Sequence, residues 1–243
     1  MEKLSYFQWL VKHTPTTWWH DSGDPDEFAF GIAQGASGVT TNPVLTSQAL
    51  HAQPAYWQSH IEPLDVQGSQ EQKVEALMRS VALPLAGALQ PVHSSTQGSQ
   101  GYVCAQVNPA DAANRDAMLA MARTFHAWAP NIAVKLPATS AGLDVLEECI
   151  AEGITITATV SFTVPQVIAI AERHRRGSAR ARKAGIVPGH CFAVIMIGRI
   201  DDYLREVAWD NKANVTEADI RCAGLAISKR AYEIYQEAHY EAV

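Results

Sequence analysis

Apolar positions along the chain alternate between two patterns. Short runs rich in β-branched and aromatic residues, typical of strands, occur at 16–22, 38–44, 102–108, 132–138, 154–160 and 192–198. Between them, apolar residues recur with helical spacing at 25–35, 71–90, 110–128, 140–153, 164–176 and 217–238. Gly35 and Gly153 stand where glycine commonly ends a helix. This order predicts a parallel sheet with crossover helices.

The length favours one architecture over another. A chain of 243 residues with this alternation predicts a (β/α)8 barrel that forms one domain over residues 1–243. The alternative is a doubly wound open sheet. No GxGxxG follows the first predicted strand, which weakens a dinucleotide-binding version of that alternative.

Composition and charge exclude several classes of protein. The net charge of −6 disfavours nucleic acid and anionic membranes as partners. No apolar stretch reaches bilayer-spanning length, and residues 1–13 lack a signal-peptide layout. The widely spaced cysteines indicate a reduced, cytoplasmic protein, and without ligand spacing we expect no metal site. The basic run 173–183 is interpreted as a solvated helix end and loop, with a phosphate-rich partner as the alternative.

Lys135 stands in the middle of the apolar run NIAVKLPATSAGL at 131–143. A buried ammonium is costly unless it is paired or deprotonated, whereas at a sheet edge it can extend to solvent. Strand alternation puts polar residues together on one face at several other predicted strands, mostly toward their carboxyl ends. These residues are Asp21, Thr40, Asn42, Gln106, Asn108, Thr155, Thr157 and Thr159. We therefore expect a polar, water-poor neighbourhood around Lys135.

A lysine in such a place suits Schiff-base chemistry. Desolvation favours the neutral amine, which can attack a carbonyl carbon and form an imine. A carboxylate must then move protons, and Asp21 is the best candidate. Arg199, after the strand predicted at 192–198, is a candidate for holding an anionic substrate end.

Five segments together resemble the transaldolase family, which includes fructose-6-phosphate aldolases. The segments are WWHDSGD (18–24), GVTTNPVL (38–45), AVKLPATSAGL (133–143), EGITITATVSFTVPQ (152–166) and IGRIDDY (197–203). The resemblance runs from about residue 15 to the end of the chain, and it implies a TIM barrel of the transaldolase type.

The resemblance also implies roles for individual residues. Lys135 matches the Schiff-base lysine, Asp21 the proton-transferring aspartate, Asn42 a donor-binding asparagine, Thr159 a threonine that holds the catalytic water, and Arg199 a phosphate-binding arginine; Thr41 and Thr157 are expected beside the substrate. The implied reaction moves a dihydroxyacetone unit from sedoheptulose 7-phosphate or fructose 6-phosphate to an aldose phosphate, in the pentose phosphate pathway of the cytoplasm. This reaction needs no cofactor and no metal. Whether the chain forms a homo-oligomer is left open.

Several positions depart from the family pattern. Gln106 stands where typical transaldolases carry a glutamate that activates water, and glutamine occurs there in the fructose-6-phosphate aldolase branch. Thr157 replaces an asparagine, and Val194 and Met196 replace a serine and a phenylalanine near the donor. By the family pattern, we expect a barrel that lacks its last one to two β/α units and the second phosphate-binding arginine.

These departures leave two functional classes open. One is a Schiff-base enzyme, either a transaldolase or a fructose-6-phosphate aldolase-like lyase. The other is an inactive, incomplete barrel that only binds sugar phosphate. An incomplete barrel also predicts exposed strand edges and self-association.

Overall fold

The computed structural model describes residues 4–61 and 68–241. The chain separates into two compact units, one of residues 1–106 with 124–133 and the other of residues 107–123 with 134–243. Each unit is described by itself, and the single domain expected over 1–243 stays a prediction. Within the described ranges, no helix has both the length and the apolar character needed to cross a membrane.

The first unit places a two-stranded parallel ladder among helices. Its elements are α1 (Tyr6–His13), α2 (Pro25–Ala33), β1 (Gly38–Val39), α3 (Pro43–Ala52), α4 (Pro54–Ile61), α5 (Gln70–Ser95) and β2 (Tyr102–Gln106). β1 pairs with β2 in parallel, with Gly38 opposite Tyr102. On its other side, β1 meets the segment 18–20, where His20 bridges Val39 in parallel. The segment 16–22 is therefore extended beside β1, as predicted, but it forms a single bridge rather than a full strand.

Side chains that cap helix ends fix where these helices begin. Asp24 and Asn42 accept hydrogen bonds from the first turns of α2 and α3, and a proline follows each of them at the first helical position. Ser69 and Gln72 form a capping box at the start of α5. The strand predicted at 38–44 is consequently short, because Asn42 and Pro43 start a helix there.

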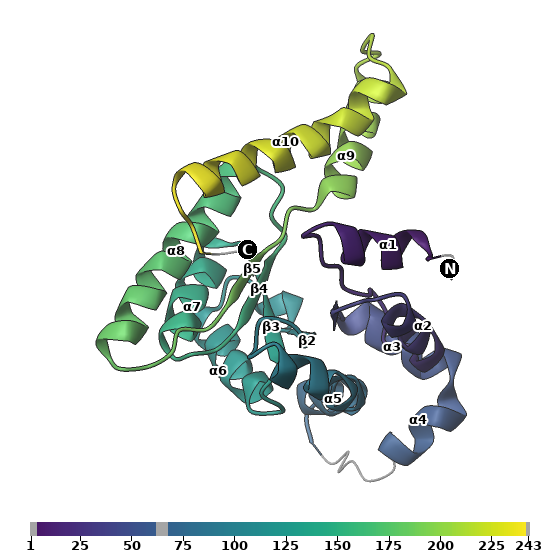
Figure 1. Cartoon of the computed structure of the whole chain (residues 1–243), viewed down its shortest axis with the longest axis vertical. Coiled ribbons are helices and arrows are strands. Elements are labelled where there is room, and N and C mark those ends of the chain that lie inside the picture. Colours follow the sequence, from purple (N-terminus) through teal and green to yellow (C-terminus); the bar gives the residue numbers. More distant parts are fainter. Residues whose placement is uncertain (1–3, 62–67, 242–243) are drawn as a thin grey trace. The chain divides into compact units, whose positions relative to one another are not determined.

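The second unit contains a three-stranded parallel ladder with helices between the strands. Its elements are η1 (Pro109–Asp111), α7 (Ser140–Ala151), β4 (Ile156–Thr159), α8 (Val164–Lys183), β5 (Cys191–Ala193), α9 (Ile197–Asp210) and α10 (Glu217–Glu237), while α6 (Arg115–His126) and β3 (Ile132–Pro137) have residues in both units. β3 pairs with β4 and β4 with β5, so the strands follow chain order. Within this unit, α9 packs against α10 (Figure 1).

The ladder of β3, β4 and β5 has two different faces. One face carries Val134, Leu136, Ile156, Ala158 and Cys191, all at most 2% exposed. α7 contacts β4 and α8 contacts β5, so helices supply the packing for this ladder. The other face carries the polar residues that the alternation predicted, described below.

Parallel strands that alternate with helices fit an incomplete (β/α) barrel, which confirms the predicted fold class. Two segments differ from prediction. The strand expected at 192–198 ends at Ala193, and Ile197 already begins α9. The prediction of a loop within the basic run 173–183 is wrong, because α8 continues through this run to Lys183.

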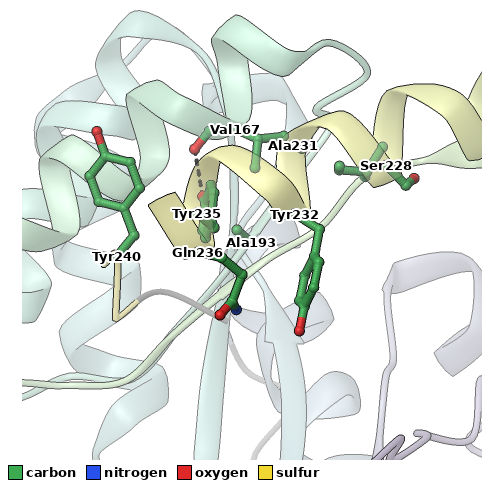
Figure 2. A pocket seen from close by; sticks show the side chains of 9 residues that line it. Val167, Ala193, Ser228, Ala231, Tyr232, Tyr235, Gln236 and Tyr240 are labelled. Atoms are coloured by element: carbon green, nitrogen blue, oxygen red, sulfur yellow. Dashed lines mark hydrogen bonds between the residues drawn. The ribbon is translucent and has the colours of Figure 1, made fainter. Parts of the chain in front are cut away.

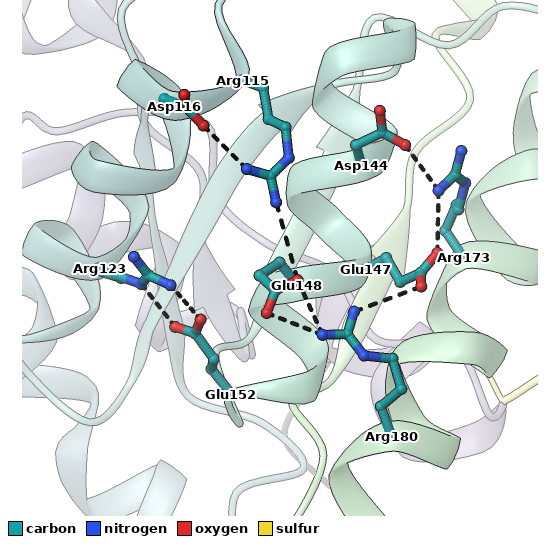
Figure 3. Close-up of polar contacts among 9 residues, drawn as sticks. All are labelled: Arg115, Asp116, Arg123, Asp144, Glu147, Glu148, Glu152, Arg173 and Arg180. Carbon is teal, nitrogen blue, oxygen red and sulfur yellow. Dashed lines mark hydrogen bonds and ion pairs between the residues drawn. The ribbon is translucent and has the colours of Figure 1, made fainter.

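Ion pairs explain why the basic run is helical and not a loose loop. Arg173 on α8 lies 2.8 Å from Asp144 and 3.0 Å from Glu147 on α7. Arg180, two turns further along α8, pairs with Glu147 and Glu148 at 3.5 and 3.0 Å (Figure 3). These carboxylates neutralise part of the run's positive charge and bind it to the neighbouring helix.

All four cysteines are reduced thiols. Cys104, Cys149 and Cys191 are buried, whereas Cys222 on α10 is exposed. Burial raises the pKa of Cys149 and of Cys191 to about 12, so both thiols stay protonated at neutral pH.

Candidate active site

Lys135 lies in the middle of β3 between two wholly buried neighbours. Val134 and Leu136 are 0% and 1% exposed, whereas Lys135 itself is half-buried. Its backbone carbonyl accepts a hydrogen bond from the N–H of Val107 at 3.2 Å. The backbone therefore fixes the Lys135 side chain on the face opposite to the one that Val134 and Leu136 fill.

The strand register brings threonines to the same face as Lys135. Lys135 is the register partner of Thr157 on β4, and Pro137, one step further along, is the partner of Thr159. Partner residues on parallel strands project to the same side of a sheet. Thr157 and Thr159 are 4% and 6% exposed, so this face offers hydroxyl groups with little water around them.

The loop after β4 is held tightly where the sheet face ends. Ser161 is fully buried and donates its hydroxyl hydrogen to the carbonyl of Val194, and the N–H of Met196 donates to Ser161 at 3.0 Å. Between Thr159 and Ser161, Val160 adopts a φ of 56°, a left-handed conformation that β-branched residues rarely adopt. The carboxyl end of β4 is thus a rigid boundary of the candidate site.

The loop after β3 has a similar anchor. Thr139 accepts a hydrogen bond from Gly142 and so caps α7, and its hydroxyl donates to the carbonyl of Ala112 at 2.7 Å. This pair of bonds fixes the chain four residues beyond Lys135.

Arg199 lies in the first turn of α9 and not on a strand. Its side chain is 72% exposed and stands 3.7 Å from Asp202. The residue before this helix, Met196, gives it no side-chain cap. A guanidinium beside uncapped N–H groups at a helix start is a combination that suits phosphate.

Four further candidates belong to the first unit, so their placement around Lys135 stays a prediction. Asp21 is exposed, directly after the segment that pairs with β1, and Gln106 is the half-buried last residue of β2. The buried Thr41 hydroxyl donates to the carbonyl of Cys104 at 2.6 Å. Asn42 Oδ1 accepts from the N–H groups of Val44 and Leu45, so any donor hydroxyl must be bound through its NH2 group.

A separate cavity in the second unit lies on the wrong face to hold substrate at Lys135. Figure 2 shows it between α8, α10 and the end of β5. Its lining includes Ala193 and Ile195, and Ala193 is the register partner of Ala158, which faces away from Lys135. Tyr235 and Val167 both line this cavity, and the Tyr235 hydroxyl donates a hydrogen bond to the carbonyl of Val167 at 2.6 Å. We assign this cavity to helix packing.

Two features of the site were not singled out from the sequence. Phe192 shares the face of Lys135, which the period-two alternation of β5 could have indicated once the strand register was known. The left-handed Val160 carries no sequence signal, since valine is a typical strand residue. Within the described ranges, no group of three or more His, Cys, Asp or Glu side chains could hold a metal ion.

Comparisons with known proteins agree on one family. A family model described as Transaldolase/Fructose-6-phosphate aldolase matches residues 18–243. The chain is similar to Transaldolase 1 of Streptomyces avermitilis, 31% identical over 206 residues, which are 82% of this chain and 54% of that protein. It is also similar to the Transaldolase of Neisseria gonorrhoeae, 29% identical over 216 residues, or 87% of this chain and 59% of that protein. The chain thus spans just over half the length of these relatives.

Proposed function

Because the chain belongs to the transaldolase/fructose-6-phosphate aldolase family, we propose that it forms a Schiff base between Lys135 and a ketose phosphate. The dihydroxyacetone unit of that donor is then transferred to an aldose phosphate. The observation that carries the proposal is the register of β3 and β4, which puts Lys135 beside the buried Thr157 and one step from Thr159.

The proposed steps begin with the Lys135 amine, which attacks the ketose carbonyl and releases water to form the imine. Asp21 accepts the proton of the donor's C4 hydroxyl while the C3–C4 bond breaks, and the imine takes up the bond electrons as an enamine. The aldehyde leaves, and the enamine carbon attacks the acceptor's aldehyde, whose oxygen regains the proton from Asp21. Water then releases the product from Lys135.

The remaining candidates hold substrate and water in this scheme. Asn42 and Thr157 bind donor hydroxyls, with Thr41 fixing the chain beside Asn42. Thr159 and Gln106 orient the water, and Arg199 binds the phosphate. The proposed substrates are sedoheptulose 7-phosphate or fructose 6-phosphate, in the cytoplasmic pentose phosphate pathway.

Gln106 favours a second candidate function, a fructose-6-phosphate aldolase-like lyase. An amide orients water by hydrogen bonds but does not accept a proton as a carboxylate does. If Gln106 determines whether the chain acts as a lyase or as a transaldolase, Gln106→Glu raises the ratio of transfer activity to simple cleavage activity. A ratio that stays fixed while both activities rise or fall removes Gln106 from that role.

Imine trapping tests the proposal. The full chain is incubated with fructose 6-phosphate and borohydride, and peptide mapping locates the adduct. We expect the adduct on Lys135, its loss in Lys135→Met and its retention in Lys183→Met, a matched control at the exposed end of α8. An unchanged adduct in Lys135→Met contradicts the assignment.

An Asp21 variant separates an enzyme from a barrel that only binds sugar phosphate. Asp21→Asn should keep imine formation but lower cleavage by about two orders of magnitude or more, because general acid–base groups contribute that much. Asp26→Asn, also exposed in the first unit, serves as the control. Trapping without turnover in the wild-type chain supports the inactive barrel instead.

A further inference from the structure

Ser161 is a fully buried serine in the loop that follows β4, two residues after Thr159. Its hydroxyl group donates a hydrogen bond to the carbonyl of Val194, and its own carbonyl accepts one from the N–H of Met196 at 3.0 Å. Val194 and Met196 belong to the connection between β5 and α9, and Met196 is the N-cap residue of α9. This one residue therefore joins the carboxyl end of β4 to the start of α9.

The backbone adopts an unfavourable conformation where it buries this hydroxyl group. Val160, the apolar residue directly before Ser161, is 45% exposed and has a φ of 56°, whereas the polar Ser161 is 0% exposed. The preferences of the two side chains favour the opposite arrangement, because valine suits a strand and serine is mostly found exposed. Strained backbone of this kind gathers at functional sites, so the bonds that Ser161 makes are candidates for a functional role.

The first turn of α9 is open at the place where Ser161 holds it. Met196 gives the helix no side-chain cap, and a Cβ at Gly198 would meet no atom of a non-neighbouring residue within 4 Å. Arg199, in the same turn, has a side chain that is 72% exposed. Because N–H groups at a helix start and a guanidinium group both suit phosphate, the position of Ser161 determines where this turn can receive one.

We propose that Ser161 is a positioning residue for Arg199, and that it thereby makes the chain prefer a phosphorylated ketose over the same ketose without phosphate. This inference rests on the proposed function, in which Lys135 binds the ketose carbonyl and Arg199 binds the phosphate. Lys135 lies on β3, which pairs with β4, so the bonds from Ser161 to Val194 and Met196 hold the start of α9 against the strands that carry the reaction.

Fructose 6-phosphate and fructose measure this preference because they differ only in the phosphate group. Each sugar is trapped on the full chain with cyanoborohydride, well below saturation, and the adduct is quantified on the Lys135 peptide. The phosphate preference is the ratio of the two trapping efficiencies. We expect Ser161→Ala to lower this ratio about tenfold, because misplacing a binding group by about 1 Å can cost about a hundredfold. Trapping of fructose should stay unchanged, whereas a general loosening of the unit would lower it.

Ser178→Ala is the matched control. Ser178 is 1% exposed in the same unit, and its hydroxyl lies 3.3 Å from the Nε2 of His174 on the same helix. This variant should leave the phosphate preference unchanged. Ser161→Cys keeps a weaker donor of similar size, so its preference should lie between those of the wild type and the alanine variant. It also replaces the alanine variant if that protein does not fold.

A double-mutant cycle tests whether Ser161 acts through Arg199. In an Arg199→Gln background, Ser161→Ala should change the phosphate preference much less than in the wild type, because both substitutions then act on the same contact. Equal factors in both backgrounds, or an unchanged preference in Ser161→Ala, overturn this inference alone. Absence of any label on wild-type Lys135 overturns the proposed function and this inference with it.

Discussion

Val160 is a β-branched residue in the left-handed region, with a φ of 56°, at the end of the strand that carries Thr159. An L-residue in this region costs roughly 1–2 kcal/mol, and asparagine tolerates it better than valine. The side chain is 45% exposed, so it contributes little buried apolar area in return. The surrounding bonds of Ser161 keep the strained conformation in place.

Replacing Val160 should therefore stabilise the chain. We expect Val160→Asn to raise the free energy of unfolding by about 1 kcal/mol, because the strain falls and little packing is lost. Denaturant unfolding measures this. Val160→Ala removes the branching at Cβ but lacks the side-chain amide with which asparagine hydrogen-bonds to the nearby backbone, so it should gain less. An asparagine variant no more stable than wild type would show that Val160 is not strained.

His174 is a buried residue of α8 whose protonation opposes folding. It is 5% exposed, and its Nε2 lies 3.3 Å from the Gly189 carbonyl and 3.3 Å from the Ser178 hydroxyl. Burial lowers the pKa of His174, and burial likewise lowers that of the half-buried His126 in the first unit. Both therefore bind a proton more readily in the unfolded chain than in the folded one.

Acid should weaken the fold before most carboxylates titrate. The unfolded pKa of histidine is about 6.5, so the stability that neutral His174 supplies is fully present above that pH. It falls as the pH drops below 6.5 toward the lower folded pKa, by at most about 1.4 kcal/mol per pH unit. Unfolding measured between pH 7.5 and 5.5 should show a shallower loss in His174→Gln. His126→Gln separates the second contribution, and equal slopes in all three proteins would contradict this account.

At the scale of elements, the contact between α7 and α8 accounts for the basic run 173–183, for which the sequence allowed two interpretations. Figure 3 shows Glu147 between Arg173 and Arg180, with its side chain 17% exposed. Arg115 of α6 approaches Glu148, which Arg180 also contacts, and Arg123 of α6 pairs with Glu152 at the end of α7. The basic run thus serves helix packing, which leaves less positive charge for a phosphate-rich partner than the sequence alone indicates.

Removing the central carboxylate should loosen this pair of helices. We expect Glu147→Gln to lower the free energy of unfolding by roughly 0.5–1 kcal/mol, since a shared, partly buried ion pair is worth more than an exposed one. The loss should shrink at 1 M NaCl because salt screens the charges. Glu233→Gln removes an ion pair whose carboxylate is 61% exposed and should cost less. Equal losses in both variants would refute a special role for Glu147.

The sequence predicted the elements better than their ends, for physical reasons visible in α8. Gly177 looks like a break after 164–176, yet a Cβ there would lie 2.6 Å from the carbonyl oxygen of Glu147. The glycine permits close helix packing and does not end the helix. Glu147 is distant in the sequence, so no local pattern indicates this contact.

The candidate site shows the same division between local and distant information. Period-two alternation was enough to put Thr157 and Thr159 on one face of their strand. The row that joins Lys135, Thr157 and Phe192 needed the register between strands, which the structure supplied. Arg199 was expected after a strand but lies on α9, because the helix begins at Ile197.

At the scale of the whole molecule, the chain passes between the two units more than once. Residues 124–133 belong to the first unit although they follow residues of the second. Asn131, which is 0% exposed, binds this segment to the rest of the first unit. Its NH2 group donates hydrogen bonds to the carbonyls of Ala86 and Gly101 at 2.9 and 2.8 Å. Neither unit is therefore a continuous segment that could fold by itself.

This interleaving predicts a single cooperative unfolding transition. Five of the six tryptophans lie in the first unit, and the sixth, Trp209, is 84% exposed. Tryptophan fluorescence thus reports mainly the first unit, while circular dichroism reports helices of both. We expect coincident midpoints. Midpoints several degrees apart, also after Trp209→Phe removes the exposed reporter, would mean that the units unfold separately.

The distribution of buried and exposed thiols makes local opening of the structure measurable by labelling. Cys222 is open to reagents, whereas Cys104, Cys149 and Cys191 are buried, the last two with pKa values of about 12. A thiol-reactive dye should label one position of α10 at once. The other three react only when the structure around them opens, so their labelling rates in native buffer record how often each region opens.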